Sequence, residues 1–516
     1  MKKLLSLVLC FVLSVACLSV LTACGSKEKT IMLWGPEEHR DLYLRWAEEF
    51  RSTHEDAFKG YKFEFAGSGD AGASAEMGKD PLQGAALYSF ANDQLADLSN
   101  LGALSPLAEE DVKWVKANNL EDAVESTKIG GQYSAYPFQA DNGYYMYYNR
   151  DAFKGTAAWD NATDKLREDV TFRDLYAALD ERGEGDAVYK DKNGNDIKLN
   201  WSNGVVCMPM ASAWYVSGIF FSVGGDYEVR YNAEGKQESA TCTFTYVQPE
   251  GTKYLKDADF SIGLNALECL KNIFLNKDGS VNKHYLFADE QYNDKYSLYI
   301  NTANEDAVKT PLAAMLCGTW KDAEIRKAWG DNYDATVLPM LEGTDGKYAY
   351  KNFRGYKHMG VNPLCEFVRD KAENIVVLHE MAKYFTNKEA QLERYNKNGS
   401  GPSNKEAVKD PTIKADKALV ALQKQYDRVC VYPETTTMKD KDGKSLAGKP
   451  VGTPSHEGYG KGFRVQDSVP QNYWTPLTDF GQNVWNEYSE KKFNAFHESN
   501  IKTTLAELQR QIEKSA

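Results

Sequence analysis

The period of the hydrophobic residues between positions 30 and 90 constrains the fold more than any other feature of the sequence. Residues 30–34 and residues 61–65 have the composition of strands. Apolar residues at helical spacing lie between these two strands, at Tyr43, Trp46, Ala47 and Phe50. A short helix that ends before Pro81 leads to a third strand through Leu87 and Phe90. Strands that alternate with helices predict an α/β unit with a largely parallel sheet.

The N-terminus has the pattern of an export signal. Lys2 and Lys3 precede an apolar run over residues 4–20, and Leu21-Thr22-Ala23-Cys24 follows as a lipobox. A basic start, an apolar segment and small residues before a cleavage point are typical of a secretory signal peptide. We therefore predict a signal peptide at residues 1–23 and a lipid on Cys24, which would anchor the mature chain to the outside of the cell membrane. An uncleaved N-terminal anchor helix is the alternative.

The composition excludes some functions and favours others. A formal net charge of −13, without a cluster of lysine and arginine, argues against nucleic acid as a partner. The six cysteines after Cys24 lie singly, so neither a zinc site nor a disulfide framework is indicated, and we expect no metal and no cofactor. Aromatic residues make up 12% of the chain, which suits carbohydrate binding because aromatic faces stack on pyranose rings. A mature chain of about 490 residues is too long for one core and indicates two lobes.

Three motifs are typical of catalytic or metal sites, but each lacks a required part. Residues 67–72 match the dinucleotide-binding glycine pattern, yet the helix behind them is broken at Pro81, so we interpret them as a glycine-rich surface turn. His379-Glu380 is followed by Lys383, where a zinc protease needs its second histidine. Residues 191–195 begin like a calcium loop without its glycine and glutamate, and we predict a hairpin turn there. We therefore predict no catalytic residues.

Local signals predict further elements. A pair of strands joined by a short turn is expected at residues 227–231 and 242–247. Thr386 and Glu389 have the spacing of a capping box, which predicts the start of a helix. A terminal helix is expected to bury one face, which consists of Ile501, Leu505, Leu508 and Ile512.

Several segments together point to one family. Residues 88–94 (YSFANDQ), followed by residues 101–107 (LGALSPL), have the pattern of a cleft-lining segment, and residues 135–151 that of a crossing between lobes. Further matching segments are residues 31–34, 214–225, 317–320, 384–387, 401–402 and 469–476. In these segments the chain resembles the extracytoplasmic solute-binding proteins of carbohydrate ABC importers, and specifically the maltose/maltodextrin-binding family.

The resemblance implies a two-lobed, periplasmic-binding-protein-like α/β fold of type 2. Its ligand cleft lies between lobes that are joined by hinge segments, expected near Asp141, Tyr356 and Gly399. The implied N-terminal lobe consists of residues 24–140 and 357–398, and the C-terminal lobe of residues 141–356 and 399–516.

The resemblance also implies ligand-binding residues. The aromatic platforms for sugar rings would be Phe90, Trp214, Trp320 and Trp474. The partners for sugar hydroxyls would be Glu38, Asp93, Gln94 and Asp141. Phe90 and Gln94 depart from the maltose binder, which has a tryptophan and a charged donor at these places, so the particular sugar stays open. An insertion near residues 226–258 has no counterpart that we can place in the family.

The implied function is the capture of an oligosaccharide, with a malto-oligosaccharide as the leading candidate. The captured sugar would be delivered to the membrane permease subunits of an ABC importer. We expect a monomer that is held at the membrane only by the lipid on Cys24 and that is not an enzyme. The alternatives are a binding protein for another solute, such as a peptide or a polyamine, and an exported carbohydrate-processing enzyme.

Overall fold

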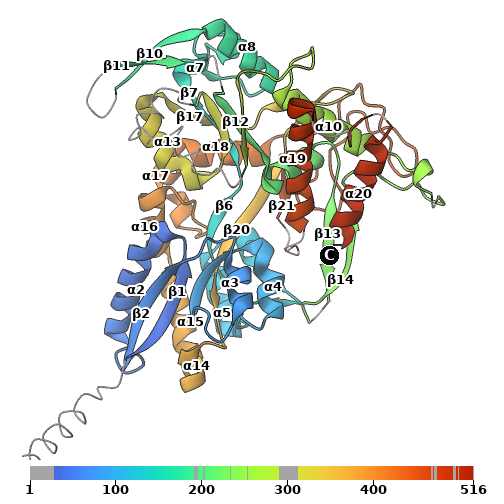
Figure 1. Cartoon of the computed structure of the whole chain (residues 1–516). Helices are drawn as coiled ribbons and strands as arrows, with labels where there is room; N and C mark the ends of the chain where they lie inside the picture. Colours follow the sequence, from blue (N-terminus) through green and yellow to red (C-terminus); the bar gives the residue numbers. More distant parts are fainter. Residues whose placement is uncertain are drawn as a thin grey trace, which may run out of the picture.

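The computed structural model describes most of the chain after its N-terminal segment. The described residues are 28–190, 196–201, 204–232, 234–252, 254–289, 312–466, 469, 473–491, 495–497 and 499–514. The predicted signal peptide, Cys24 and the turn at residues 191–195 lie outside them. Two α/β halves lie one above the other in Figure 1 and are joined in the middle by β6 (Tyr136–Asn142) and β20 (Asn352–Val361).

The lower half is built on a sheet with the strand order β2–β1–β3–β20–β21, and β6 pairs with β20 beside this path. Strand β1 (Lys29–Gly35) pairs in parallel with β2 (Tyr61–Gly67) and β3 (Leu87–Ala91), which confirms the predicted parallel arrangement. β20 runs antiparallel to β3 and β6 and parallel to β21 (Phe463–Val465).

Helix α2 (Arg40–Thr53) covers this sheet with the face that the sequence predicts. Tyr43 and Trp46 pack edge-on against Phe385 of α15 (Asn374–Phe385), with the ring centroids 5.5 Å apart in both pairs. The other helices of the lower half are α3 (Ala73–Lys79), α4 (Leu95–Asn100), α5 (Glu109–Asn118), α6 (Glu121–Glu125), α14 (Glu366–Asp370) and α16 (Lys388–Asn398). Short strands β4 (Lys128–Ile129) and β5 (Gln132–Tyr133) form a small hairpin.

The upper half is built on a second sheet, with the order β15–β12–β16–β7–β17. Its strands are β7 (Tyr145–Asn149), β12 (Val206–Ala211), β15 (Tyr285–Asp289), β16 (Ala314–Cys317) and β17 (Tyr333–Thr336). Its helices are α7 (Arg150–Phe153), α8 (Phe172–Arg182), α9 (Ala213–Ser222), α10 (Ser261–Phe274), α13 (Asp322–Trp329), α17 (Pro411–Lys414), α18 (Lys417–Asp427), α19 (Trp474–Glu490) and α20 (Ile501–Lys514). Two-stranded pairs at its surface are β8–β9 (Trp159–Asp160, Lys165–Leu166), β10–β11 (Glu184–Lys190, Asp196–Asn200), β13–β14 (Tyr227–Tyr231, Gln237–Cys242) and β18–β19 (Met340–Glu342, Lys347–Ala349).

The chain passes from one half to the other at the turn between β6 and β7. β6 pairs with β20 in the lower sheet, whereas β7 pairs with β16 and β17 in the upper sheet. Only Gly143 and Tyr144 separate the two strands. Asp141 therefore lies at the border between the halves.

Two local predictions are wrong by a small shift. Asn387, not Thr386, caps α16, because the Asn387 side chain accepts a hydrogen bond from the Ala390 N–H while the Thr386 hydroxyl donates to Ala382 O. The strand that pairs with β13 is Gln237–Cys242 rather than residues 242–247. A tight turn closes at Gly235, which has a φ of +75°, so the return strand starts at once.

The predicted terminal helix is present as α20, with Leu505, Leu508 and Ile512 buried. Among the residues that the structure describes, no helix is both long and apolar enough to cross a bilayer.

Candidate functional site

Three aromatic rings from distant parts of the chain meet beside the border between the halves. Trp214 on α9 stacks on Phe353 of β20, with ring centroids 4.7 Å apart and planes 24° apart. Trp474, the first residue of α19, lies 6.1 Å from Trp214 and 5.8 Å from Phe353. The indole N–H of Trp214 is buried without a hydrogen-bond acceptor among the described residues. A broad apolar surface with an unused donor is suited to an amphipathic ligand.

The carboxylate of Asp141 is held rigidly at the same border. Its Oδ2 accepts hydrogen bonds from the Thr319 hydroxyl at 2.5 Å and from the Gly401 N–H at 2.6 Å. Its Oδ1 is buried and has no hydrogen-bond partner among the described residues. Burial raises the pKa of Asp141, although the charge of Lys357 and these hydrogen bonds oppose the shift. One carboxylate oxygen of Asp141 is therefore hydrogen-bonded, and the other is available as an acceptor.

Trp320 follows Thr319 and is the most exposed of the four predicted platforms, with 38% of its surface accessible. Its indole lies against Gly318, where a Cβ would collide with the ring, so the glycine is required for this close approach. The same glycine lies next to the carbonyl of Gly143, in the turn between β6 and β7. Trp320 therefore borders that turn from the upper half.

The segment from Asp141 to Tyr144 brings the predicted residues together. Asp141 binds Thr319 beside Trp320, and the Tyr144 ring lies 6.0 Å from the Trp214 ring. Trp214, Trp320, Trp474 and Asp141 consequently surround one crossing of the chain, which the sequence order of these residues does not reveal.

The predicted residues from the lower half lie at the end of β3 and are more deeply buried. Phe90 has no exposed surface and packs against Tyr88 and His358, at centroid distances of 5.8 and 5.6 Å. The Gln94 side chain is also fully buried, where it donates to Asp70 O and accepts from the Ser74 N–H at 2.9 Å. In this conformation both side chains serve the packing of the lower half.

Asp93 lies next to them and differs in its electrostatics. Its backbone carbonyl accepts a hydrogen bond from the Val469 N–H, so this end of β3 touches the segment that leads to Trp474. Burial, with the charge of Asp97 nearby, raises the pKa of Asp93 to about 7. The carboxyl group therefore changes its charge near neutral pH.

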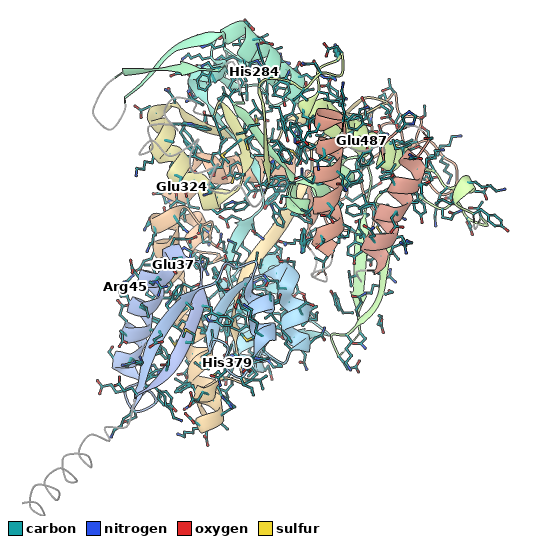
Figure 2. All side chains as sticks on the ribbon, in the orientation of Figure 1. Glu37, Arg45, His284, Glu324, His379 and Glu487 are labelled. Carbon is teal, nitrogen blue, oxygen red and sulfur yellow. The ribbon has the colours of Figure 1, made fainter. Side chains whose placement is uncertain are left out.

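Glu38 lies in the 3-10 turn η1 (Glu37–His39), which follows β1. Its side chain is exposed, and Figure 2 shows the neighbouring Glu37 at the end of the lower half that faces the upper half. His39 in the same turn bonds Asn398, at 2.7 Å, and residues 398–401 lead directly to the contact with Asp141. Glu38 thus lies on the rim of the border region.

A buried network next to this border was not predicted from the sequence. Lys357 of β20 forms an ion pair of 2.8 Å with Asp70, which also accepts a hydrogen bond from Ser89 at 2.6 Å. Burial opposes ionisation of Asp70, but Lys357 and Ser89 hold its pKa below the usual range. Arg394 is also buried, with its guanidinium 3.6 Å from the centroid of the Phe138 ring.

The comparison with protein families identifies the family of this chain. A sequence model of the bacterial extracellular solute-binding proteins matches residues 46–421. The chain belongs to this family. The proteins of this family bind solutes outside the cell, which fits the predicted extracytoplasmic location.

Solved structures support the fold of this solute-binding protein. The maltodextrin-binding protein MalE1 from L. casei BL23, without ligand, has a TM-score of 0.59 and 20% identity and covers 94% of this chain and 99% of its own. The Thermus thermophilus maltotriose-binding protein, bound to maltotriose, has a TM-score of 0.59 and 17% identity with the same coverage. MalX from Streptococcus pneumoniae, in complex with maltopentaose, has a TM-score of 0.56 and 15% identity, with 94% and 100% covered. Comparison with curated protein sequences gives no match. The predicted two-lobed α/β fold is confirmed.

Two of the three motifs that are typical of catalytic or metal sites lie within the described residues of this solute-binding protein. His379 is buried, where its ring nitrogens bond Ser105 and Tyr136, each at 2.9 Å, and Figure 2 shows it inside the lower half. The glycine-rich residues 67–72 lead into the seven-residue α3, but Asp70 within them is buried, so the turn is not wholly at the surface. Within the described ranges, no group of three or more histidine, cysteine, aspartate or glutamate side chains has the arrangement of a metal site.

Proposed function

We propose that this solute-binding protein captures an oligosaccharide between its two lobes and delivers it to the permease subunits of an ABC importer. The observation that carries the proposal is that the Trp214–Trp474 pair, Trp320 and the buried carboxylate of Asp141 all border the segment of residues 141–144. The three solved structures described above support a malto-oligosaccharide, because each is named for a maltodextrin or was solved with a malto-oligosaccharide.

The chemistry of the border region suits a sugar. A pyranose ring has apolar C–H faces that stack on indoles, and its hydroxyls need acceptors within the ring plane. The spare Oδ1 of Asp141 and the spare N–H of Trp214 are an acceptor and a donor of this kind. Charge-assisted hydrogen bonds to a carboxylate are stronger than those between neutral groups, so Asp141 would fix the orientation of one ring.

The remaining predicted residues complete the proposed site from the lower half. Glu38 and Asp93 would bind hydroxyls at the rim and at the end of β3. Phe90 and Gln94 have no exposed surface and are covered by neighbours of the lower half, so they would reach a sugar only if these neighbours move. A weaker contribution from these two residues is therefore expected.

The proposed lobes are residues 24–140 with 357–398 and residues 141–356 with 399–516. The switch of sheets between β6 and β7 supports a hinge near Asp141, and the left-handed backbone of Gly399, with a φ of +80°, supports one after α16. A ligand that contacts both lobes stabilises the closed arrangement by the difference between its affinities for the closed and open states.

Anchoring and assembly are part of the same proposal. A lipid on Cys24, after removal of residues 1–23, would keep a monomeric protein close to the importer. A single tether of this kind leaves the two lobes in water, where they can meet both the sugar and the permease.

Calorimetric titration of the chain that starts at Gly25 tests the proposal. Maltotriose and maltopentaose should bind saturably, whereas a tripeptide and spermidine should give no heat of binding. The same mixtures should develop no new reducing ends, which separates capture from hydrolysis. Preferential binding of the peptide or of spermidine would favour another solute, and a rise in reducing ends would favour an exported enzyme.

A further inference from the structure

The hairpin β13–β14 belongs to the insertion that the family pattern does not explain, and it connects the two halves. At its base, Asp226 binds Arg464 of β21 at 2.9 Å and His456 at 2.8 Å, which fixes the start of the hairpin to the segment 456–464. At its tip, Gly235 lies so close to Ile129 that a Cβ there would be 3.2 Å from the Ile129 side chain. Figure 1 shows the hairpin extending from the upper half toward α4 of the lower half.

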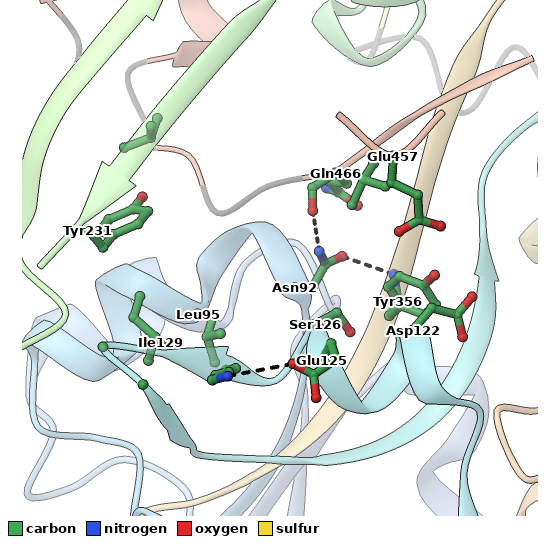
Figure 3. Close-up of a pocket in the computed structure, with 15 residues that line it drawn as sticks. Asn92, Leu95, Asp122, Glu125, Ser126, Ile129, Tyr231, Tyr356, Glu457 and Gln466 are labelled. Carbon is green, nitrogen blue, oxygen red and sulfur yellow. Dashed lines mark hydrogen bonds and ion pairs between the residues drawn. The ribbon is translucent and has the colours of Figure 1, made fainter. Parts of the chain in front are cut away.

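A pocket of about 460 Å³ lies between this hairpin and the lower half. One wall consists of Asn92, Leu95 and residues 122–131 from the lower half. The opposite wall consists of Val229 and Tyr231 of the hairpin, with residues from the segment 457–466 (Figure 3). This volume is within the range of pockets that bind small molecules.

The pocket is separate from the tryptophan cluster. Successive side chains of a strand point to opposite faces, and β20 lies between the two sites. Arg354 and Tyr356 of β20 face the pocket side, where Arg354 bonds Asp122 and Tyr356 lines the cavity. Phe353 points to the other side, where it packs against Trp214. A ligand in this pocket would therefore leave the tryptophans free.

The cationic side chains around the pocket are already paired with carboxylates. Arg354 bridges Asp122 and Glu457, with a distance of 3.2 Å to Glu457. Lys128 lies 3.7 Å from Glu125. Because both cations are engaged by carboxylates, an anionic ligand would meet a wall of net negative charge. The carboxylates keep lone pairs that can accept hydrogen bonds from hydroxyl groups.

One buried polar group of the pocket lies beside a carboxylate. Tyr356 is 1% exposed, and its hydroxyl faces Asp122. Burial, with the Asp122 carboxylate beside it, raises the pKa of Tyr356, so the phenol stays protonated and can donate. Opposite, the Tyr231 ring stands near the apolar side chains of Leu95 and Ile129 (Figure 3).

We propose that this pocket is a second binding site, for a small, neutral, polyhydroxylated molecule of the size of a monosaccharide or disaccharide. The Tyr231 ring and the apolar wall would contact its C–H faces, while Tyr356, Glu125 and Glu457 would bind its hydroxyls. Because the walls come from both halves, a ligand there also couples to the arrangement of the lobes. This proposal does not rest on sugar binding at the tryptophans.

Glucose titration of the Trp474→Ala chain, from Gly25 onward, tests the second site without the aromatic cluster. Saturation-transfer NMR should detect saturable glucose binding that Tyr231→Ala weakens about tenfold, since a lost stacking contact is worth about 1.4 kcal/mol. Tyr356→Phe removes only one hydroxyl and should weaken binding about fivefold, as expected for one hydrogen bond. Tyr254→Ala, at an exposed tyrosine of the same insertion, is the matched control and should leave binding unchanged.

Three results would overturn the proposal. The first is the absence of saturable glucose and maltose binding in the Trp474→Ala chain while circular dichroism shows an intact fold. The second is glucose binding that neither Tyr231→Ala nor Tyr356→Phe weakens. The third is binding of spermidine or inorganic phosphate in place of glucose, with the same dependence on Tyr231, because that would assign the pocket to a charged ligand.

Discussion

Replacing Trp474 with alanine removes the ring that joins the aromatic cluster to α19. The ring lies 6.1 Å from Trp214, 5.8 Å from Phe353 and 4.9 Å from Tyr473, so three of its neighbours remain in place after the change. The substitution therefore deletes one platform while the carboxylate of Asp141 and its hydrogen bonds are untouched.

The expected loss of affinity follows from the surface that the ring would cover. One face of an indole buries about 80 Å² against a sugar, which is worth about 2 kcal/mol at about 25 cal/mol per Å². Stacking adds about 1 kcal/mol beyond this burial. A total of about 3 kcal/mol corresponds to a loss of about 100-fold in affinity.

Isothermal titration with maltopentaose measures this loss, and a second tryptophan of the same helix supplies the control. Trp485 of α19 stacks on Phe287, with ring centroids 4.7 Å apart, and packs against Phe274 at 5.3 Å. Trp485→Ala should lower the free energy of unfolding by about 3 kcal/mol, as expected for the loss of a packed aromatic residue. Its affinity for maltopentaose should remain that of the unchanged chain.

The reasoning is refuted if Trp474→Ala binds maltopentaose with unchanged affinity while circular dichroism shows an intact fold. It is equally refuted if Trp485→Ala weakens binding as strongly, because the loss would then reflect general destabilisation of the upper lobe.

Three further predictions concern anchoring and the lower lobe. Cys24→Ala should abolish labelling by a radioactive fatty acid and release the protein from the membrane fraction, whereas retention would support an uncleaved anchor helix. Because the folded pKa of Asp93 is raised to about 7, its folded state binds the extra proton, so stability should fall as pH rises from about 4 to about 7. In urea titrations at several pH values, Asp93→Asn should remove this dependence of stability on pH. An unchanged pH dependence would contradict the raised pKa of Asp93. Lys357→Met leaves Asp70 buried without its cation and should lower the free energy of unfolding by about 3–5 kcal/mol. The double variant Lys357→Met/Asp70→Asn should recover part of this loss. Equal stability of the single and the double variant would argue against the ion pair.

Hydrophobic periodicity was enough to predict the first elements of the lower half, from β1 to β3. The alternation in β2 and the helical spacing of Tyr43, Trp46 and Phe50 arise because each element buries one face, and the structure buries those faces. Element boundaries were less predictable. Thr386 ends α15 and its hydroxyl donates to Ala382 O, so Asn387 takes the N-cap of α16, although both residue types are good N-caps.

The residues of the candidate site could be named only through the family pattern. Nothing in the local sequence indicates that Trp214 and Trp474 lie 6.1 Å apart, because 260 positions separate them in the chain. Phe353 was missed because its sequence context is that of an ordinary strand residue, and only the fold brings it into contact with both indoles. Lys357 carried a usable signal, because a lysine within an otherwise buried strand needs a partner charge.

Two residues that were predicted to bind the ligand are buried in the structure. Phe90 and Gln94 fit the family pattern, but both lie at 0% exposure, so an argument from residue type alone could not reveal their packing role. The insertion at residues 226–258 remained unexplained by sequence because its hairpin acquires a role only through contact with Ile129 in the other half.

Small-angle X-ray scattering of the chain from Gly25, with and without maltopentaose, tests most directly whether the sugar is captured between moving lobes. Binding in the same samples is verified by titration, so that saturation is certain. A ligand that contacts both lobes favours the closed state, and the radius of gyration should fall when maltopentaose is added, but not when it is added to Trp474→Ala at the same concentration. A scattering profile that stays unchanged at verified saturation would contradict capture by closure.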